Sequence, residues 1–168
     1  DHVEIPFIED YDVELNGLKE FEVTFYEKSL VGYIEYMGSY KYFDKDGIVV
    51  ESSSRLIENV PYVTGIDFNE IKLYEKMKVD RDEIFNVVMN ITKLISKYEI
   101  SVSEIQFNHF FELTLYSGDI EILLGKHTTY DEQIAKLSGV LKEAEGMKGI
   151  LHLENYSDSS SNIIFEKK

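Results

Sequence analysis

The most regular alternation of apolar and polar residues lies between positions 107 and 125. Phenylalanine and leucine occupy every second position of 111–115, which is the period of a half-buried strand. The sequence Ser-Gly-Asp at 117–119 predicts a tight turn, because glycine tolerates a positive φ. An apolar run at 120–124 follows. We therefore predict a β-hairpin here and place it at the centre of a sheet.

Two segments carry apolar residues at helical spacing, over 80–98 and over 129–146. Each begins with two residues, three positions apart, that are typical of a capping box. The two pairs are Asp80 with Glu83 and Thr129 with Glu132. The glycine at 146 is a natural end for the second segment. The pattern predicts a helix over each segment.

Shorter alternating runs predict the remaining strands. They lie at 8–15, 21–26, 31–36, 41–43, 48–50, 149–155 and 162–166, and a short irregular or one-turn helical stretch is predicted within 52–59. Two strands alone are marginal in water, so the first pair must pack on something else. The fold class that follows is α+β, with a mixed or antiparallel sheet and the two main helices packed on one of its faces.

Composition narrows the class of protein. The chain has 168 residues, 43% hydrophobic and 13% aromatic, so it can bury a core, and one domain plus a fragment is the expected organisation. Its formal net charge of −15 opposes binding to nucleic acid or to an anionic membrane surface. The chain has no cysteine, which excludes disulfides, thiolate catalysis and cysteine-based zinc sites. No apolar run reaches the roughly 20 residues of a membrane-spanning helix.

No residue pattern in the chain predicts catalysis or a bound metal. Asp44-x-Asp46-Gly47 resembles the start of a calcium loop, but its glycine comes too early, and a β-turn is the preferred interpretation. The four histidines lie far apart in sequence and lack ligand spacing. There is no nucleophile elbow around any serine. The sequence therefore favours a binding module without enzymatic activity, cofactor or metal.

Several short motifs, in order along nearly the whole chain, resemble those of the FtsQ/DivIB family of bacterial cell-division proteins. EKSLVGY at 27–33 is similar to the segment that opens the β domain of the family, and FDKDGIV at 43–49 to its hydrophobic-D-x-x-G-hydrophobic hairpin. VPYVTG at 60–65 resembles L-P-x-[LI]-x-G, and residues 113–126 resemble L-x-L-x-x-G-x-x-[VI]-x-L-G-[RK] with one additional residue after Gly118. IPFI at 5–8 resembles the end of the POTRA domain that precedes the β domain in this family.

Two positions depart from the family pattern. Leu30 stands where the family usually has proline. His152-Leu153-Glu154 stands where it commonly has aspartate, a hydrophobic residue and arginine. We therefore expect the salt bridge typical of that position to be absent.

The resemblance implies a domain organisation and a role. Residues 1–28 would be the C-terminal strands of a POTRA domain, and residues 29–168 the β domain. The family is a non-enzymatic scaffold of the divisome, anchored in the cell membrane by a single transmembrane helix that this chain lacks, with both domains on the extracytoplasmic side. It binds the bitopic proteins FtsL and FtsB, or DivIC in Gram-positive bacteria, during septum formation.

The last predicted strand, at 162–166, is the candidate partner-binding site. A final strand joined to its neighbour by a polar loop is expected at a sheet edge, with unpaired backbone N–H and C=O groups. In the family, the corresponding strands receive a partner strand by β-augmentation. Carried over by position, the site residues are Tyr156, Ile163, Ile164 and Phe165.

Two other interpretations stay open at this point. A POTRA-type chaperone or secretion module would be expected to contain repeated POTRA units, and the sequence has no internal repeat. A cell-wall enzyme would need a pocket with convergent polar groups and a perturbed pKa.

Overall fold

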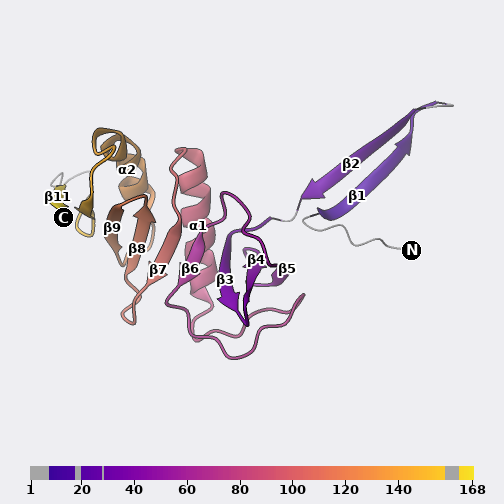
Figure 1. Ribbon diagram of the computed structural model, residues 1–168, viewed down its shortest axis with the longest axis horizontal. Coiled ribbons are helices and arrows are strands. Elements are labelled where there is room, and N and C mark those ends of the chain that lie inside the picture. Colours follow the sequence, from indigo (N-terminus) through magenta and orange to yellow (C-terminus); the bar gives the residue numbers. More distant parts are fainter. Residues whose placement is uncertain (1–7, 18–19, 28, 158–162) are drawn as a thin grey trace.

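The computed structural model describes residues 8–17, 20–27, 29–157 and 163–168. Residues 1–7 of the predicted POTRA strands and Asn162 of the predicted last strand lie outside the described residues. The described part has the predicted α+β class (Figure 1). Its strands are β1 Ile8–Leu15, β2 Phe21–Glu27, β3 Gly32–Tyr36, β4 Ser39–Phe43, β5 Val49–Ser53, β6 Tyr62–Thr64, β7 Glu104–Phe107, β8 Leu113–Ser117, β9 Ile120–Gly125, β10 Gly149–His152 and β11 Ile164–Lys167. Its helices are α1 Glu83–Lys97 and α2 Asp131–Glu143.

Nine strands form one mixed sheet, in the order β11-β10-β9-β8-β7-β6-β3-β4-β5. The pairs β3–β6, β6–β7 and β9–β10 are parallel, and the others are antiparallel. A parallel pair needs a crossover connection, and α1 joins β6 to β7 while α2 joins β9 to β10. The predicted hairpin is β8–β9, and it lies beside β7, the middle strand of the sheet.

The core lies between one face of this sheet and the helices. Alternate strand positions are buried, among them Ile105 in β7 and Leu115 in β8. Ile91 of α1 and Leu137 of α2 belong to the same cluster and are fully buried as well. Figure 1 shows both helices on one side of the sheet. Neither helix covers the opposite face.

Both helices begin later than their predicted capping boxes. Helix α1 starts after Asp82 and α2 after Tyr130, and neither of these N-cap side chains bonds to its helix. The Asp82 carboxylate instead contacts Lys76 Nζ at 2.6 Å. The two predicted capping boxes are therefore wrong, although acidic residues still occupy both first turns, where the helix dipole favours them. Neither described helix is long and apolar enough to cross a membrane.

Of the two structures predicted for residues 52–59, the stretch after β5 adopts the irregular one and not the one-turn helix. Ser52 and Ser53 continue β5, and the chain then turns around the side chain of Tyr42. The Tyr42 hydroxyl accepts the N–H of Ile57 at 2.8 Å and donates to the carbonyl of Arg55 at 3.4 Å. A buried side chain from a neighbouring strand thus organises this turn in place of helical hydrogen bonds.

Strands β1 and β2 pair only with each other, and Figure 1 shows this hairpin apart from the main sheet. Leu15 and Phe21 lie directly opposite each other and are 64% and 71% exposed. Val13 and Val23 form the next exposed pair on the same face. The hairpin therefore carries an apolar stripe that the described part of the chain leaves uncovered.

Candidate functional site

Strand β11 forms one edge of the nine-stranded sheet. It pairs with β10, and no other described strand lies beside it. The opposite edge is partly occupied, because Val49 of β5 donates its N–H to Glu75 O at 3.1 Å and accepts from Tyr74 N at 2.7 Å. Within the described chain, β11 has no such cover on its outer side. The prediction that the last strand lies at a sheet edge is confirmed.

The backbone groups of β11 alternate between its two sides. Lys168, just after the strand, donates its N–H to a carbonyl just before β10, at 3.1 Å. Such hydrogen-bonded pairs recur at every second residue of an antiparallel ladder, so Ile164 and Glu166 also bond toward β10. The N–H and C=O groups of Phe165 and Lys167 consequently point away from the sheet, where a further strand could bind.

The four predicted site residues lie on both faces of this edge. Tyr156, Ile163 and Phe165 are half-buried and pack against the core. Phe165 lies opposite the buried Leu151, on the helix side of the sheet. Ile164 is 62% exposed and faces the other way. The structure thus places three of the residues on the core side and Ile164 on the open face.

Tyr156 lies in the turn that follows β10, and two hydrogen bonds fix its backbone. Its N–H donates to Leu153 O at 3.1 Å, and its carbonyl accepts from Nε2 of Gln133 at 3.3 Å. Gln133 belongs to the first turn of α2 and is buried. The Tyr156 side chain lines a cavity of about 360 Å³, together with Glu132 of α2 and Glu154 of the turn. An apolar or aromatic side chain of a bound strand could enter beside this ring.

A histidine and two glutamates connect β10 with β11. His152 Nδ1 lies 3.0 Å from Glu154 Oε1, and its Nε2 lies 3.7 Å from Glu166 Oε2. The hydrogen bond to Glu154 raises the pKa of His152, Glu166 adds to this effect, and desolvation opposes it. Positions 152 and 154 lack the aspartate and arginine of the family's bridge, and His152 would form an ion pair with Glu154 here when it is protonated.

We expect the pairing of His152 with Glu154, and to a smaller degree with Glu166 of β11, to depend on pH. The folded pKa of His152 lies above its ordinary value of 6.5. The stabilisation is therefore fully present below that value and is lost as the pH rises through the folded pKa. Its size should be below about 1 kcal/mol, as for other partly exposed pairs.

An NMR titration of the His152 ring measures this directly. In wild type the pKa should exceed 6.5. It should fall toward that value in Glu154→Gln and by a smaller amount in Glu166→Gln. A wild-type pKa at or below 6.5, or one that Glu154→Gln leaves unchanged, would show that the pair is not formed in solution.

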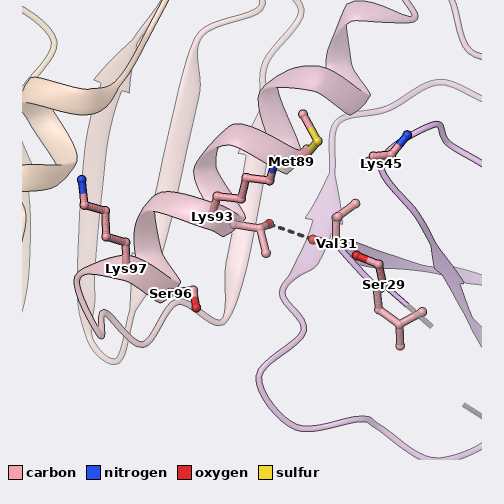
Figure 2. A pocket seen from close by; sticks show the side chains of 9 residues that line it. Ser29, Val31, Lys45, Met89, Lys93, Ser96 and Lys97 are labelled. Atoms are coloured by element: carbon pink, nitrogen blue, oxygen red, sulfur yellow. Dashed lines mark hydrogen bonds between the residues drawn. The ribbon is translucent and has the colours of Figure 1, made fainter. Parts of the chain in front are cut away.

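A second cavity, of about 460 Å³, lies between α1 and the chain that enters β3 (Figure 2). Its polar lining consists of Ser29, Lys45, Thr92, Lys93, Ser96 and Lys97. Thr92 Oγ1 donates to Val31 O at 2.9 Å, and Lys45 Nζ contacts Asp46 at 2.6 Å. Figure 2 shows the three amino groups pointing to different places. These lysines therefore do not converge on one reacting point.

The motifs tested for metal binding take structural roles. Asp44 Oδ1 accepts the N–H groups of Asp46 at 2.9 Å and of Ile48 at 3.0 Å, which confirms the predicted β-turn. Within the described residues, no three or more histidine, aspartate or glutamate side chains gather in a way that could hold a metal ion.

No family model matches this sequence, and no curated protein matches it. The structure itself gives the class of fold, which is α+β, with β11 as one edge of the sheet among the described strands. Sequence reasoning found the edge but not the His152 cluster. The alternating positions of His152, Glu154 and Glu166 in two predicted strands were the available signal, but only the register between the strands brings them together.

Proposed function

We propose that this chain is a non-enzymatic interaction domain of the bacterial divisome, of the FtsQ/DivIB type. In this role it binds bitopic proteins of the FtsL and FtsB/DivIC types on the extracytoplasmic side of the cell membrane during septum formation. The observation that carries the proposal is the outer side of β11, which no described strand covers, at the end of a nine-stranded sheet whose other edge is partly covered. The family named in the proposal rests on the resemblance of the motifs over residues 5–126 to those of FtsQ/DivIB proteins.

Strand addition fits the chemistry of this edge. Phe165 and Lys167 offer outward N–H and C=O groups, which give affinity in β-augmentation. Side chains on both faces give specificity, with Ile164 on the open face and Phe165 on the core side. The cavity beside Tyr156 adds a place for one side chain of the incoming strand.

The β1–β2 hairpin supports the division of the chain at residue 28. Its exposed pairs Leu15–Phe21 and Val13–Val23 form an apolar surface of the kind that another element normally covers. Under this proposal, the remainder of a POTRA domain packs there.

Proline substitutions in β11 test the proposed edge. Lys167→Pro removes an outward donor without touching a bond to β10, so it should weaken binding to the soluble extracytoplasmic domain of an FtsB- or DivIC-type partner on the order of tenfold. Lys167→Ala is the matched control, because it removes the charge but keeps the N–H, and should bind nearly as wild type. Ile164→Pro should abolish binding, since the Ile164 N–H faces β10 and its loss detaches the strand.

Tyr156→Ala tests the core side of the same site and should weaken binding through loss of the ring beside the cavity. Isothermal titration calorimetry gives the affinities, and thermal unfolding followed by circular dichroism shows that each variant is folded. Folded Lys167→Pro, Ile164→Pro and Tyr156→Ala variants that all bind as tightly as wild type would place the partner elsewhere.

A further inference from the structure

The sheet face that the helices leave open carries a row of tyrosine and glutamate side chains. The cross-strand register aligns one residue of each strand across this face. From β5 to β9 the aligned residues are Glu51, Tyr42, Tyr33, Tyr62, Glu104, Tyr116 and Glu121. We call this set the Tyr–Glu row. It contains no lysine or arginine, and strands distant in sequence build it.

Ring stacking holds the tyrosine half of the row in place. The rings of Tyr33 and Tyr62 are stacked, with centroids 5.1 Å apart and planes 22° apart. Tyr42 lies 5.3 Å from Tyr33 on its other side, and Tyr40 stands edge-on to Tyr33 at 5.4 Å. Tyr33 and Tyr62 are half-buried, so part of each ring remains open to solvent.

Hydrogen bonds hold the other half of the Tyr–Glu row, from Glu104 to Glu121, in place. The Thr64 hydroxyl donates to Glu104 Oε1 at 2.6 Å, and the Tyr116 hydroxyl donates to Gln106 Oε1 at 3.0 Å. Lys168 Nζ contacts Glu121 at 2.9 Å, at the far end of the row. The row is therefore an ordered surface, and a ligand would meet side chains that are already in position.

The middle of the row is electrostatically negative. Burial raises the pKa of Tyr62, and the nearby charges of Glu35 and Glu104 raise it further. Burial likewise raises the pKa of Tyr116, the charges of Glu121 and Glu104 raise it further, and Lys168 opposes them. Carboxylates thus lie close to the rings on both sides, and a cation above the rings would be attracted by both groups.

We propose that the Tyr–Glu row binds an extended, arginine-containing segment of a partner protein. A guanidinium group can stack on a tyrosine face and pair with a neighbouring carboxylate at the same time. The net charge of −15 attracts a basic segment and repels a second copy of this chain or a nucleic acid.

The size of the row sets the length of the ligand. The part from Tyr33 to Glu121 crosses β3, β6, β7, β8 and β9, which at roughly 4.8 Å per strand is about 19 Å. An extended peptide covers this distance with about six residues. This site lies on the sheet face, whereas the proposed strand-binding site lies at the β11 edge, and Lys168 after β11 contacts the row at Glu121.

A synthetic peptide of alternating arginine and serine, about nine residues long, is the probe. We expect NMR shift changes centred on Tyr33, Tyr62 and Tyr116, tighter binding than by the matching lysine–serine peptide, and weaker binding at higher ionic strength. A glutamate–serine peptide should not bind. A neutral N-acetylglucosamine hexamer is included because aromatic surfaces also bind sugars, and it should not bind either.

The double variant Glu35→Gln/Glu104→Gln should weaken arginine-peptide binding about three- to tenfold. Its control, Glu143→Gln/Glu145→Gln, removes the same charge at the exposed end of α2 and should change affinity little. Tyr62→Leu should also weaken binding of the arginine peptide. It replaces the double variant as the test if the double variant does not fold. Equal weakening by both double variants, no binding of the arginine peptide, or binding of the sugar in its place would each overturn the proposal.

Discussion

Replacement of Ile91 by aspartate is expected to lower the free energy of unfolding by about 4 kcal/mol. Ile91 lies in α1 and is fully buried in the core that the helices share with the sheet. The substitution removes the packing of a large aliphatic side chain and places a carboxylate where it has no partner, and each effect is destabilising.

Asn86→Asp is the matched control for Ile91→Asp. It introduces the same charge on the exposed side of the same helix and should change stability by less than about 0.5 kcal/mol. Urea unfolding of both variants gives the two values. If Ile91→Asp unfolded at the same urea concentration as wild type, α1 would not pack on the sheet as described.

Gly65→Ala is also expected to lower the free energy of unfolding strongly, by about 3 kcal/mol or more. Gly65 follows β6 with φ +74, a conformation that costs other residues energy. In addition, a Cβ at this position would collide with the backbone carbonyl of Phe107 in β7. To make room, β6 and β7 would have to separate at the pair Thr64–Gln106.

Gly38→Ala separates the two causes. Gly38 lies between β3 and β4 with φ +76, and a Cβ there meets nothing within 4 Å. This variant should therefore show only the conformational cost, about 1 kcal/mol. Thermal unfolding of both variants measures the difference, and an equal loss in the two would mean that the close approach of Gly65 to β7 is not required.

The sequence predicts those elements whose signal is local and long enough. The hairpin β8–β9 combines regular alternation with a turn of its own, and the apolar spacing of α1 extends over four turns. Strand β7 has four residues, too few for a period to stand out. The carboxylate of Asp82, the N-cap of α1, contacts Lys76, and the turn after β5 bonds to the hydroxyl of Tyr42. Sequence patterns show neither contact.

The same distinction holds for the candidate sites. The sequence predicts the edge position of β11 from its polar connection to the preceding strand, and among the described strands the structure bears this out. The outward direction of Phe165 and Lys167 depends on the register with β10, which the sequence does not specify. The Tyr–Glu row depends on several registers at once, including two parallel pairs between strands that are not consecutive.

Amide hydrogen exchange, measured on the chain alone and with the soluble extracytoplasmic domain of an FtsB- or DivIC-type protein, decides whether β11 receives a partner strand. We expect the outward amides of Phe165 and Lys167 to exchange rapidly in the free chain and to become protected in the complex. The amides of Ile164 and Glu166, which bond to β10, should be protected to the same degree in both. Rapid exchange of Phe165 and Lys167 in a saturated complex would contradict strand addition at β11.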